Sequence, residues 1–257
     1  MVNENKAISQ LKRLKTTIGE QGKAGLKARI KFFCVAIGSG LKESLVNYDL
    51  FDQHNIGERD LCTCFEMYDG NGNIVTQWFG GGQDLTPYYL FNEDAMHFHT
   101  VCKTACDKHN ADFYPKFKET CDNYFWNAHR NEARGIGGLF FDYLKETSNF
   151  SMQDRYDFVT EVGNSFLNSY VPIVEKRKDL TYKKEHKDWQ EVRRGRYVEF
   201  NLVHDRGTLF GLKTNGRIES ILMSLPPVVQ WVYNQEPKEG SEEFKLLEVL
   251  KQPKNWL

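Results

Sequence analysis

The chain has 257 residues, 40% of them hydrophobic and 14% aromatic, with a formal net charge of −1. This length and composition allow a large packed core, and the near-zero charge gives no reason to expect a nucleic acid or an anionic membrane as partner. No apolar run is long enough to span a bilayer and no secretory signal is recognisable, so we expect a cytoplasmic location.

The first half of the chain contains one clear hairpin. Residues 5–31 are basic and are predicted to form a helix broken by glycines. Strands are predicted at 64–68 and 74–79, because they flank Asp-Gly-Asn-Gly at 69–72, a sequence typical of a hairpin turn. The glycine-rich residues 80–87 that follow are predicted to form a loop.

Apolar residues at helical spacing predict four further helices. The first begins near Glu93, after the N-cap candidate Asn92. The second covers about 115–134 and ends at Gly135. The third covers about 151–177, where Pro172 is expected to kink or end it, and the last begins near Ser241.

The region between the last two helices alternates apolar and polar residues. This alternation predicts an antiparallel meander with strands at 197–203, 208–213 and 217–225. Because helices and strands come in blocks rather than in strict alternation, the expected fold class is α+β.

Six cysteines are present and none forms a CxxC pair. Without a secretory signal, reduced and buried thiols are the favoured interpretation. Cys102 and Cys106 have the i,i+4 spacing of one helix face and could hold a metal, but two small core residues are the commoner outcome.

Three groups of polar residues are candidates for chemistry. The triple glycine at 80–82 lets a backbone approach a ligand closely beside Asp84, although a tight structural turn is the commoner reason for it. His99 and His129 could meet across two packed helices, although core histidines are commoner than metal ligands. The third group is a set of arginines near the predicted meander: Arg193, Arg194, Arg196, Arg206 and Arg217. They suit either a polyanionic ligand or a salt-bridged surface.

Between about Phe65 and the C-terminus the chain contains a series of distinctive motifs: Trp78–Pro87 (WFGGGQDLTP), Glu93–His99, Tyr114–Phe117, His129–Asp142 (HRNEARGIGGLFFD), Arg193–Leu202 (RRGRYVEFNL), Asp205–Thr208 and Arg217–Pro227 (RIESILMSLPP). In this order they resemble the oxygen-dependent coproporphyrinogen III oxidase family. Their number and order make the resemblance very specific over about three quarters of the chain.

The resemblance implies a large, flat antiparallel sheet covered by helices on both faces, in a homodimer. It implies conversion of two propionates of coproporphyrinogen III to vinyl groups in heme biosynthesis, giving protoporphyrinogen IX with molecular oxygen as co-substrate. No organic cofactor is expected, and a divalent metal has been argued for some members. Members occur in the cytosol or the mitochondrial intermembrane space, and the missing targeting signal favours the cytoplasm here.

Matching residues then take the family's roles. By this resemblance, Asp84 would hold the pyrrole N–H groups and assist their deprotonation, and Arg134 would bind a propionate. Asn215, Gly216 and Arg217 would contact substrate. His99 and His129 match histidines proposed as metal ligands, and the strand region Tyr197–Trp231 would form the dimer interface. We expect Asp84→Ala to abolish turnover but to leave the fold intact, because Asp84 is expected in a loop.

Residues 1–64 depart from the family pattern. Members carry a Pro-Thr-x-His-x-Asn-x-Arg strand upstream of the hairpin, and here Arg59 stands where the His belongs and Thr63 where the Arg belongs. We therefore divide the chain into a divergent or incomplete segment, 1–64, and an oxidase domain, 65–257. A working oxidase is favoured over a catalytically impaired paralogue that binds porphyrinogen or pairs with an active subunit. A metal-dependent enzyme built on His99 and His129 is the third hypothesis.

Overall fold

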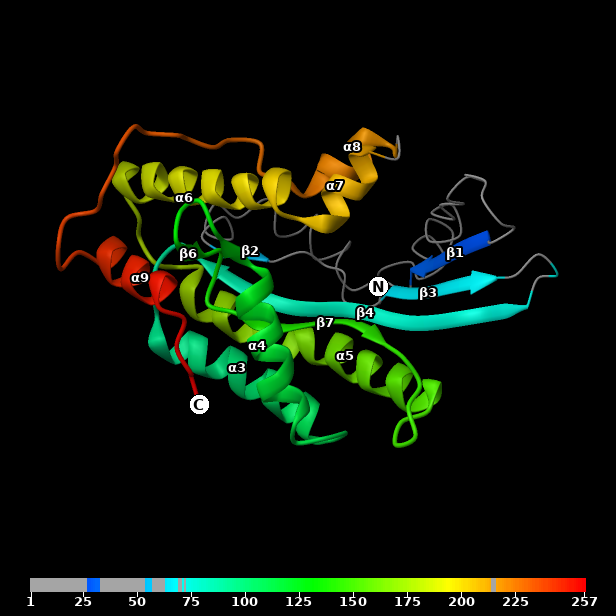
Figure 1. Cartoon of the computed structure of the whole chain (residues 1–257). Helices are drawn as coiled ribbons and strands as arrows, with labels where there is room; N and C mark the ends of the chain where they lie inside the picture. Colours follow the sequence, from blue (N-terminus) through cyan, green and yellow to red (C-terminus); the bar gives the residue numbers. More distant parts are fainter. Residues whose placement is uncertain (1–26, 33–53, 57–62, 69–70, 72, 214–215) are drawn as a thin grey trace.

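The structure is a computed structural model that describes residues 27–32, 54–56, 63–68, 71, 73–213 and 216–257 (Figure 1). In chain order its elements are β1 (Lys27–Phe32), β2 (His54–Ile56), β3 (Thr63–Tyr68), β4 (Ile74–Pro87), α3 (Asn92–Asp107), α4 (Phe113–Tyr124), β5 (Trp126–Asn127), β6 (Glu132–Ala133), β7 (Gly138–Leu144), α5 (Met152–Arg177), α6 (Lys184–Val203), α7 (Arg206–Lys213), α8 (Ile218–Ile221), η2 (Leu222–Ser224) and α9 (Glu242–Lys251). Helices and antiparallel strands are both present, in agreement with the expected α+β class. No helix in these ranges is long and apolar enough to cross a membrane.

The strand β4 is the centre of the described sheet. It pairs antiparallel with β3 and β2 along one edge and with β7 along the other, and β1 pairs with β3. The hairpin predicted between 64–68 and 74–79 is confirmed as β3 and β4. Residues 27–32 form β1, so the helix predicted over 5–31 is wrong at its end; residues 5–26 lie outside the described ranges.

The loop predicted at 80–87 is also wrong, because β4 continues through the three glycines to Pro87. The glycines allow the strands to approach closely. A Cβ atom on Gly82 would lie 2.3 Å from the carbonyl oxygen of Leu139 on β7. The glycine run therefore indicates a crowded strand pair here, and turn-forming composition alone could not distinguish the two.

One face of the β4–β7 pair packs against α3, α4 and α5 (Figure 1). Phe79 and Leu85 of β4 and Phe141 of β7 are buried in one cluster with Phe98 of α3 and Phe158 of α5. These residues alternate with others along the strands, as a sheet with one core-facing side requires. In Figure 1, α6, α7 and α8 lie on the other side of β4.

One predicted helix boundary needs correction. The helix predicted over 115–134 ends at Tyr124, and the chain turns into the short β5–β6 hairpin, in which Trp126 pairs with Ala133. Gly135 therefore does not cap a helix. Tertiary contacts outweigh the helical pattern here, since Glu132 at the end of the hairpin forms a buried ion pair with Arg193 of α6.

Pro172 does not end α5, which runs without a break from Met152 to Arg177. A proline removes the hydrogen bond to the carbonyl four residues earlier, here that of Asn168. The Nε2–H of His97 on α3 donates to this carbonyl at 2.9 Å. A side chain from a neighbouring helix therefore satisfies the acceptor that Pro172 leaves open, which helps the helix to continue.

The predicted strands at 197–203, 208–213 and 217–225 are wrong, because the structure forms α6, α7, α8 and η2 over these ranges. The strand pattern placed Tyr197 on the face opposite Val198 and Leu202. In the structure Tyr197 is 1% exposed and Leu202 is 41% exposed. Trp189, Arg193, Tyr197 and Phe200 are buried instead, at the spacing of one helix face. The final helix is confirmed, with the Ser241 side chain accepting from the Phe244 amide.

Candidate active site

The two faces of β4 differ in chemistry at the three glycines. Gln83 lies on the core-facing side, where its amide donates to Ser165 of α5 at 2.8 Å. Trp78 and Asp84 differ by an even number of positions along the strand and so share the opposite face. The residues between them on that face, Gly80 and Gly82, have no side chains. The face that carries Asp84 is therefore flat in the middle.

Asp84 is the only charged residue of β4, and it is buried in an ion pair. Its Oδ2 accepts from Nη2 of Arg134 at 2.7 Å, and the two side chains are 6% and 0% exposed. Arg134 directly follows β6, and its amide donates to the carbonyl of Phe125. The β5–β6 hairpin thus positions Arg134 against the strand. Asp84 lies in a strand and not in a loop, which corrects the sequence-based expectation.

Aromatic rings enclose the guanidinium of Arg134. Its Cζ lies 3.8 Å from the ring centroid of Phe125, 5.1 Å from that of Tyr197 and 5.2 Å from that of Phe200. The last two residues belong to α6, so the sheet and this helix both contribute to the site. In such an environment with little water, ionic contacts are stronger than at a surface. The arrangement can orient a carboxylate and a guanidinium toward a polar group of a ligand.

An aromatic pair stands at the other end of the glycine face. The rings of Trp78 and Tyr143 stack at 5.4 Å with an interplanar angle of 24°. Tyr143 has a φ of 54°, and the register of β7 shifts against β4 nearby. This β-bulge lets both Phe141 and Leu144 face the core although they are three residues apart, and it places Tyr143 on the other face. Sequence reasoning missed this pair, since only the bulge brings the two rings together.

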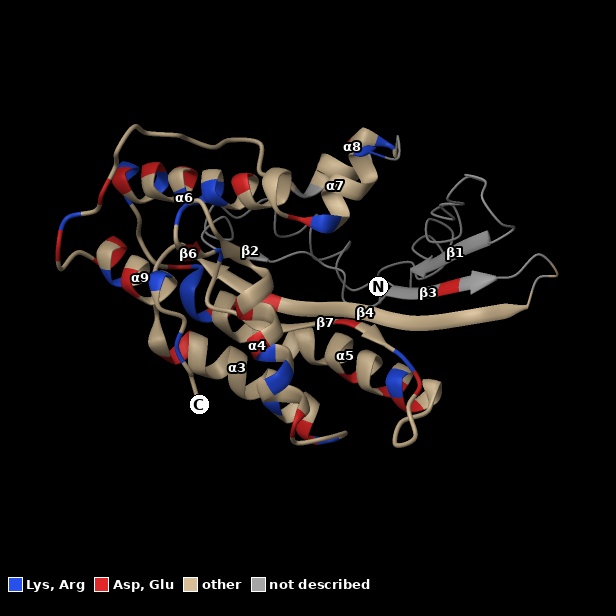
Figure 2. Ribbon diagram, in the orientation of Figure 1, with Lys and Arg blue, Asp and Glu red and all other residues tan. Residues whose placement is uncertain are grey.

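Most of the clustered arginines bind acidic residues of the chain itself. Arg130 and Arg196 both bind Glu199, at 2.7 and 3.0 Å, and Arg193 binds Glu132 at 2.7 Å. Figure 2 shows the two signs of charge interspersed along α6. For Arg193 and Arg196, which belong to the predicted group, the salt bridges of that alternative are confirmed, although the Arg193 pair is buried and does not lie at the surface. Burial favours a raised pKa for Glu199, but hydrogen bonds from Arg130 and His129 outweigh it and lower this pKa to about 2.

The structure does not bring Arg217 to Asp84. Its side chain is 79% exposed, and its Nε lies 3.9 Å from a carboxylate oxygen of Glu219. Gly216 closes a turn by donating its amide to the carbonyl of Gly211. Asn215 lies outside the described residues. The roles of these three residues as substrate contacts stay predictions.

Three cysteines behave as core residues. Cys102, Cys106 and Cys121 are free and buried. Burial raises the pKa of Cys102 and of Cys121 well above the usual value and that of Cys106 to about 12. These thiols are therefore protonated near neutral pH and poorly suited to nucleophilic or metal chemistry. The side chains of Cys34, Cys62 and Cys64 lie outside the described part.

Comparison with known proteins decides the family. The model of a family described as "Coproporphyrinogen III oxidase" matches residues 60–256. The chain belongs to the coproporphyrinogen III oxidase family.

Relatives in this family come from bacteria and plants. An oxygen-dependent coproporphyrinogen-III oxidase of Francisella philomiragia is 57% identical over 180 residues, or 70% of this chain and 57% of that protein. The chloroplastic coproporphyrinogen-III oxidase 1 of Arabidopsis thaliana is 56% identical over 180 residues, or 70% of this chain and 46% of that protein. A chloroplastic enzyme of Glycine max is 57% identical over 189 residues, or 74% of this chain and 48% of that protein. The chain thus spans about half the length of these relatives.

The two histidines that match proposed metal ligands of the family have separate partners. The Nε2–H of His99 donates to the carbonyl of Ile136 at 3.0 Å, so its Nδ1 accepts from the Tyr114 hydroxyl, also at 3.0 Å. His129 is bonded to His204 at 3.0 Å and to Glu199 at 2.8 Å. Within the described ranges, no three His, Cys, Asp or Glu side chains form a group that could hold a metal ion. The arrangement does not fit a metal centre shared by His99 and His129, and we assign no step to one.

The buried His99 leads to a prediction about acid stability. Burial lowers the pKa of His99 from 6.5 to about 4, and the bond to Ile136 opposes this only partly. The unfolded chain therefore binds a proton that the native state does not bind. As pH falls from about 6.5 toward about 4, the free energy of unfolding should fall by about 1–3 kcal/mol from this residue.

An NMR titration of the His99 ring measures this pKa directly. We expect the ring signal to change well below pH 5 while the protein stays folded. The His99→Gln variant, which has no titrating ring, should show a smaller loss of stability over the same pH range in urea unfolding experiments. A ring that titrates near pH 6.5 would contradict the prediction.

Proposed function

We propose that the chain carries the catalytic part of an oxygen-dependent coproporphyrinogen III oxidase, which converts two propionates of coproporphyrinogen III to vinyl groups and forms protoporphyrinogen IX in heme biosynthesis. The observation that carries this proposal is the buried pair of Asp84 and Arg134 beside the flat glycine face of β4. A tetrapyrrole with four propionates needs both an apolar surface and cationic groups. Among ligands that combine an apolar ring with several carboxylates, membership of the coproporphyrinogen III oxidase family favours coproporphyrinogen III.

The proposed pose places a pyrrole over Gly80 and Gly82. Asp84 would accept the pyrrole N–H groups and assist their deprotonation, which makes the ring electron-rich. A guanidinium presents five N–H donors, so Arg134 can bond to Asp84 and to a propionate at the same time. The stacked rings of Trp78 and Tyr143 would border the macrocycle at the far end.

The proposed reaction balances with molecular oxygen as the sole oxidant. Each propionate loses CO2, and the electron pair of the broken C–C bond becomes the new C=C bond. The carbon next to the ring loses a hydrogen together with the two electrons of its C–H bond. Oxygen takes up these electrons with that hydrogen and one further proton, giving hydrogen peroxide. No organic cofactor is needed for this balance.

An aerobic assay tests the proposal. Purified full chain is incubated with coproporphyrinogen III, and protoporphyrinogen IX is measured after its oxidation to the fluorescent porphyrin. We expect turnover in air and none under nitrogen. No product in air from a folded chain would remove the oxidase proposal. Full activity in excess chelator would dismiss the metal-dependent alternative.

The alternative, a catalytically impaired paralogue, is favoured by one observation: the family's upstream His and Arg positions hold Arg59 and Thr63. Both residues belong to the part of the chain that we divided off as 1–64. This alternative predicts saturable binding of coproporphyrin without turnover. It also predicts activity only when an intact family member is added. The proposed oxidase domain, 65–257, would then act as a binding module.

Arg217 offers a test of the proposed substrate contacts. Arg217→Ala should weaken substrate binding by about 1–3 kcal/mol, the scale for loss of a charged hydrogen bond. Because the side chain is exposed and its only ion pair in the described ranges is a long surface contact with Glu219, stability should not change. Steady-state kinetics should then show a raised KM with little change in kcat. Equal kinetics for the variant and the original chain would contradict a substrate role.

The proposal also covers the oligomeric state of the protein. We propose a homodimer through residues Tyr197–Trp231, now as helices, supported by the exposed apolar side chains of Phe210, Met223 and Trp231. Light scattering behind gel filtration tests this, and Phe210→Glu with Met223→Glu should yield a monomer. The large flat sheet with helices on both faces and the cytoplasmic location are proposed from the family resemblance and the sequence.

A further inference from the structure

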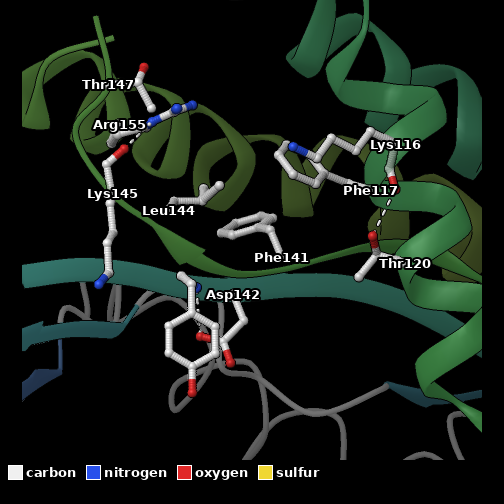
Figure 3. A pocket seen from close by; sticks show the side chains of 10 residues that line it. Lys116, Phe117, Thr120, Phe141, Asp142, Leu144, Lys145, Thr147 and Arg155 are labelled. Carbon is white, nitrogen blue, oxygen red and sulfur yellow. Dashed lines mark hydrogen bonds between the residues drawn. The ribbon is translucent and has the colours of Figure 1, made fainter.

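A cavity lies between α4 and the first turn of α5, over the end of β7 (Figure 3). Its volume is about 230 Å³. Phe117, Phe141 and Leu144, which belong to the buried core cluster, form its apolar floor. Pockets for drug-sized ligands usually measure about 300–1,000 Å³, so this one suits a smaller molecule.

The cavity contains a buried cation. Arg155 is 7% exposed, and its Nε donates to the carbonyl of Lys145 at 3.1 Å. Its guanidinium carbon lies 4.4 Å from the ring centroid of Phe150. Among the described residues, neither terminal nitrogen of Arg155 is bonded to an acceptor and no carboxylate pairs with it. Burial lowers the pKa of Arg155, which is the sign of a charge without enough compensation.

A second cation reaches the cavity from the opposite side. Figure 3 shows Lys116 of α4 and Arg155 of α5 extending toward each other above Phe141 and Leu144. The ammonium of Lys116 lies 5.8 Å from the ring centroid of Phe117 and has no acidic partner in the described ranges. Two converging cations over an apolar floor favour an anion that has an apolar body.

The acid that borders the cavity does not neutralise these cations. Asp142 accepts the amide of Tyr143 at 2.8 Å and lies 3.7 Å from Nη2 of Arg206, which belongs to α7. Figure 3 shows its carboxylate on the other side of β7 from Phe141 and Leu144. The same alternation separates the cavity from Asp84, which lies on the face opposite the core. The apolar floor of the cavity and Asp84 therefore lie on opposite faces of the sheet, and Tyr143, which lines the cavity, is common to the borders of both sites.

We propose that this cavity binds a small organic carboxylate, with its anionic end between Lys116 and Arg155 and its apolar body over Phe117, Phe141 and Leu144. The planar fork of an arginine matches a carboxylate in two parallel hydrogen bonds. Thr147 also lines the cavity. A phosphate dianion would need more donors than these residues supply.

The test is isothermal titration of the full chain with 3-phenylpropanoate, and with 3-phenylpropanamide as its neutral analogue. We expect saturable one-to-one binding of the carboxylate, with a Kd of about 0.1–1 mM. The neutral amide and inorganic phosphate should each bind at least about tenfold more weakly, because the first lacks the charge and the second lacks the apolar body. Equal binding of carboxylate and amide would overturn the proposal.

Two variants locate the binding to this cavity. Arg155→Gln should weaken binding of 3-phenylpropanoate at least about tenfold, and Lys116→Gln about three- to tenfold. Lys116 is exposed, so its variant keeps the fold even if Arg155→Gln does not. The matched control is Lys103→Gln, an exposed lysine of α3 that pairs with Asp107. It should leave the Kd unchanged. No saturation up to about 20 mM, or an unchanged Kd in a folded Lys116→Gln, would refute the assignment.

Discussion

Replacing Asp84 with alanine should abolish turnover and lower the free energy of unfolding by about 3–5 kcal/mol, the usual cost of breaking a buried ion pair. The cost arises because Arg134, whose side chain is 0% exposed, would keep its charge without the carboxylate that Nη2 now contacts. The sequence-based expectation that this variant leaves the fold intact is therefore revised. Urea unfolding and the aerobic assay measure the two effects.

Asp84→Asn separates chemistry from stability. Its amide oxygen can still accept from Arg134, and its volume is almost that of the acid, so the loss of stability should be smaller than for alanine. The proton acceptor is lost, and kcat should fall by about 10²–10⁴-fold. If Asp84→Asn kept full turnover, Asp84 would have no role as an acceptor of pyrrole protons. If Asp84→Ala unfolded at the same urea concentration as the original chain, the ion pair would not be a stabilising contact.

Of all substitutions that add one methyl group to the described sheet, Gly138→Ala should cause the largest loss of folding stability. Gly138 is paired with Asp84, and a Cβ atom built on it would lie 2.1 Å from the carbonyl oxygen of Gln83 and 2.8 Å from the Cα of Asp84. Both atoms belong to the backbone of β4, which cannot move aside without breaking the pairing. We expect a loss of at least about 3 kcal/mol, or failure to fold, together with loss of turnover.

A control comes from a glycine whose added methyl group would meet one side-chain atom and no backbone atom. Gly207→Ala, at the start of α7, would place its Cβ atom 3.3 Å from a carboxylate oxygen of Asp205, which can be relieved by a shift of a few tenths of an ångström. This variant should therefore lose much less stability than Gly138→Ala in urea unfolding experiments. Comparable losses in the two variants would show that any added methyl group is harmful, and that the close approach of β7 to β4 is not the cause.

Local sequence patterns predicted an element correctly where they fitted only one kind of secondary structure. The hairpin of β3 and β4, the helices that follow Phe91 and Ser151, and the last helix were all predicted from turn residues and apolar spacing. The N-cap predicted at Asn92 is wrong, because Phe91 is the N-cap residue of α3 and no described side chain caps this helix. The patterns failed where the same apolar residues fitted both a strand and a helix. Val198 and Phe200 suit a strand face and also a helix. Burial of Tyr197 near Arg134 and of Trp189 against Tyr88 favours the helix.

The sequence by itself determined the family and the identity of its polar candidates, because long motifs survive in order even where their local structure is misjudged. It could not determine which candidates meet. Only the tertiary structure decided that Asp84 pairs with Arg134, that Arg130, Arg193 and Arg196 are bound to acids of the chain, and that His99 and His129 are held by different partners. The physical reason is that these contacts join residues 50 or more positions apart in several cases, and their geometry depends on how the hairpin, β4 and α6 pack together.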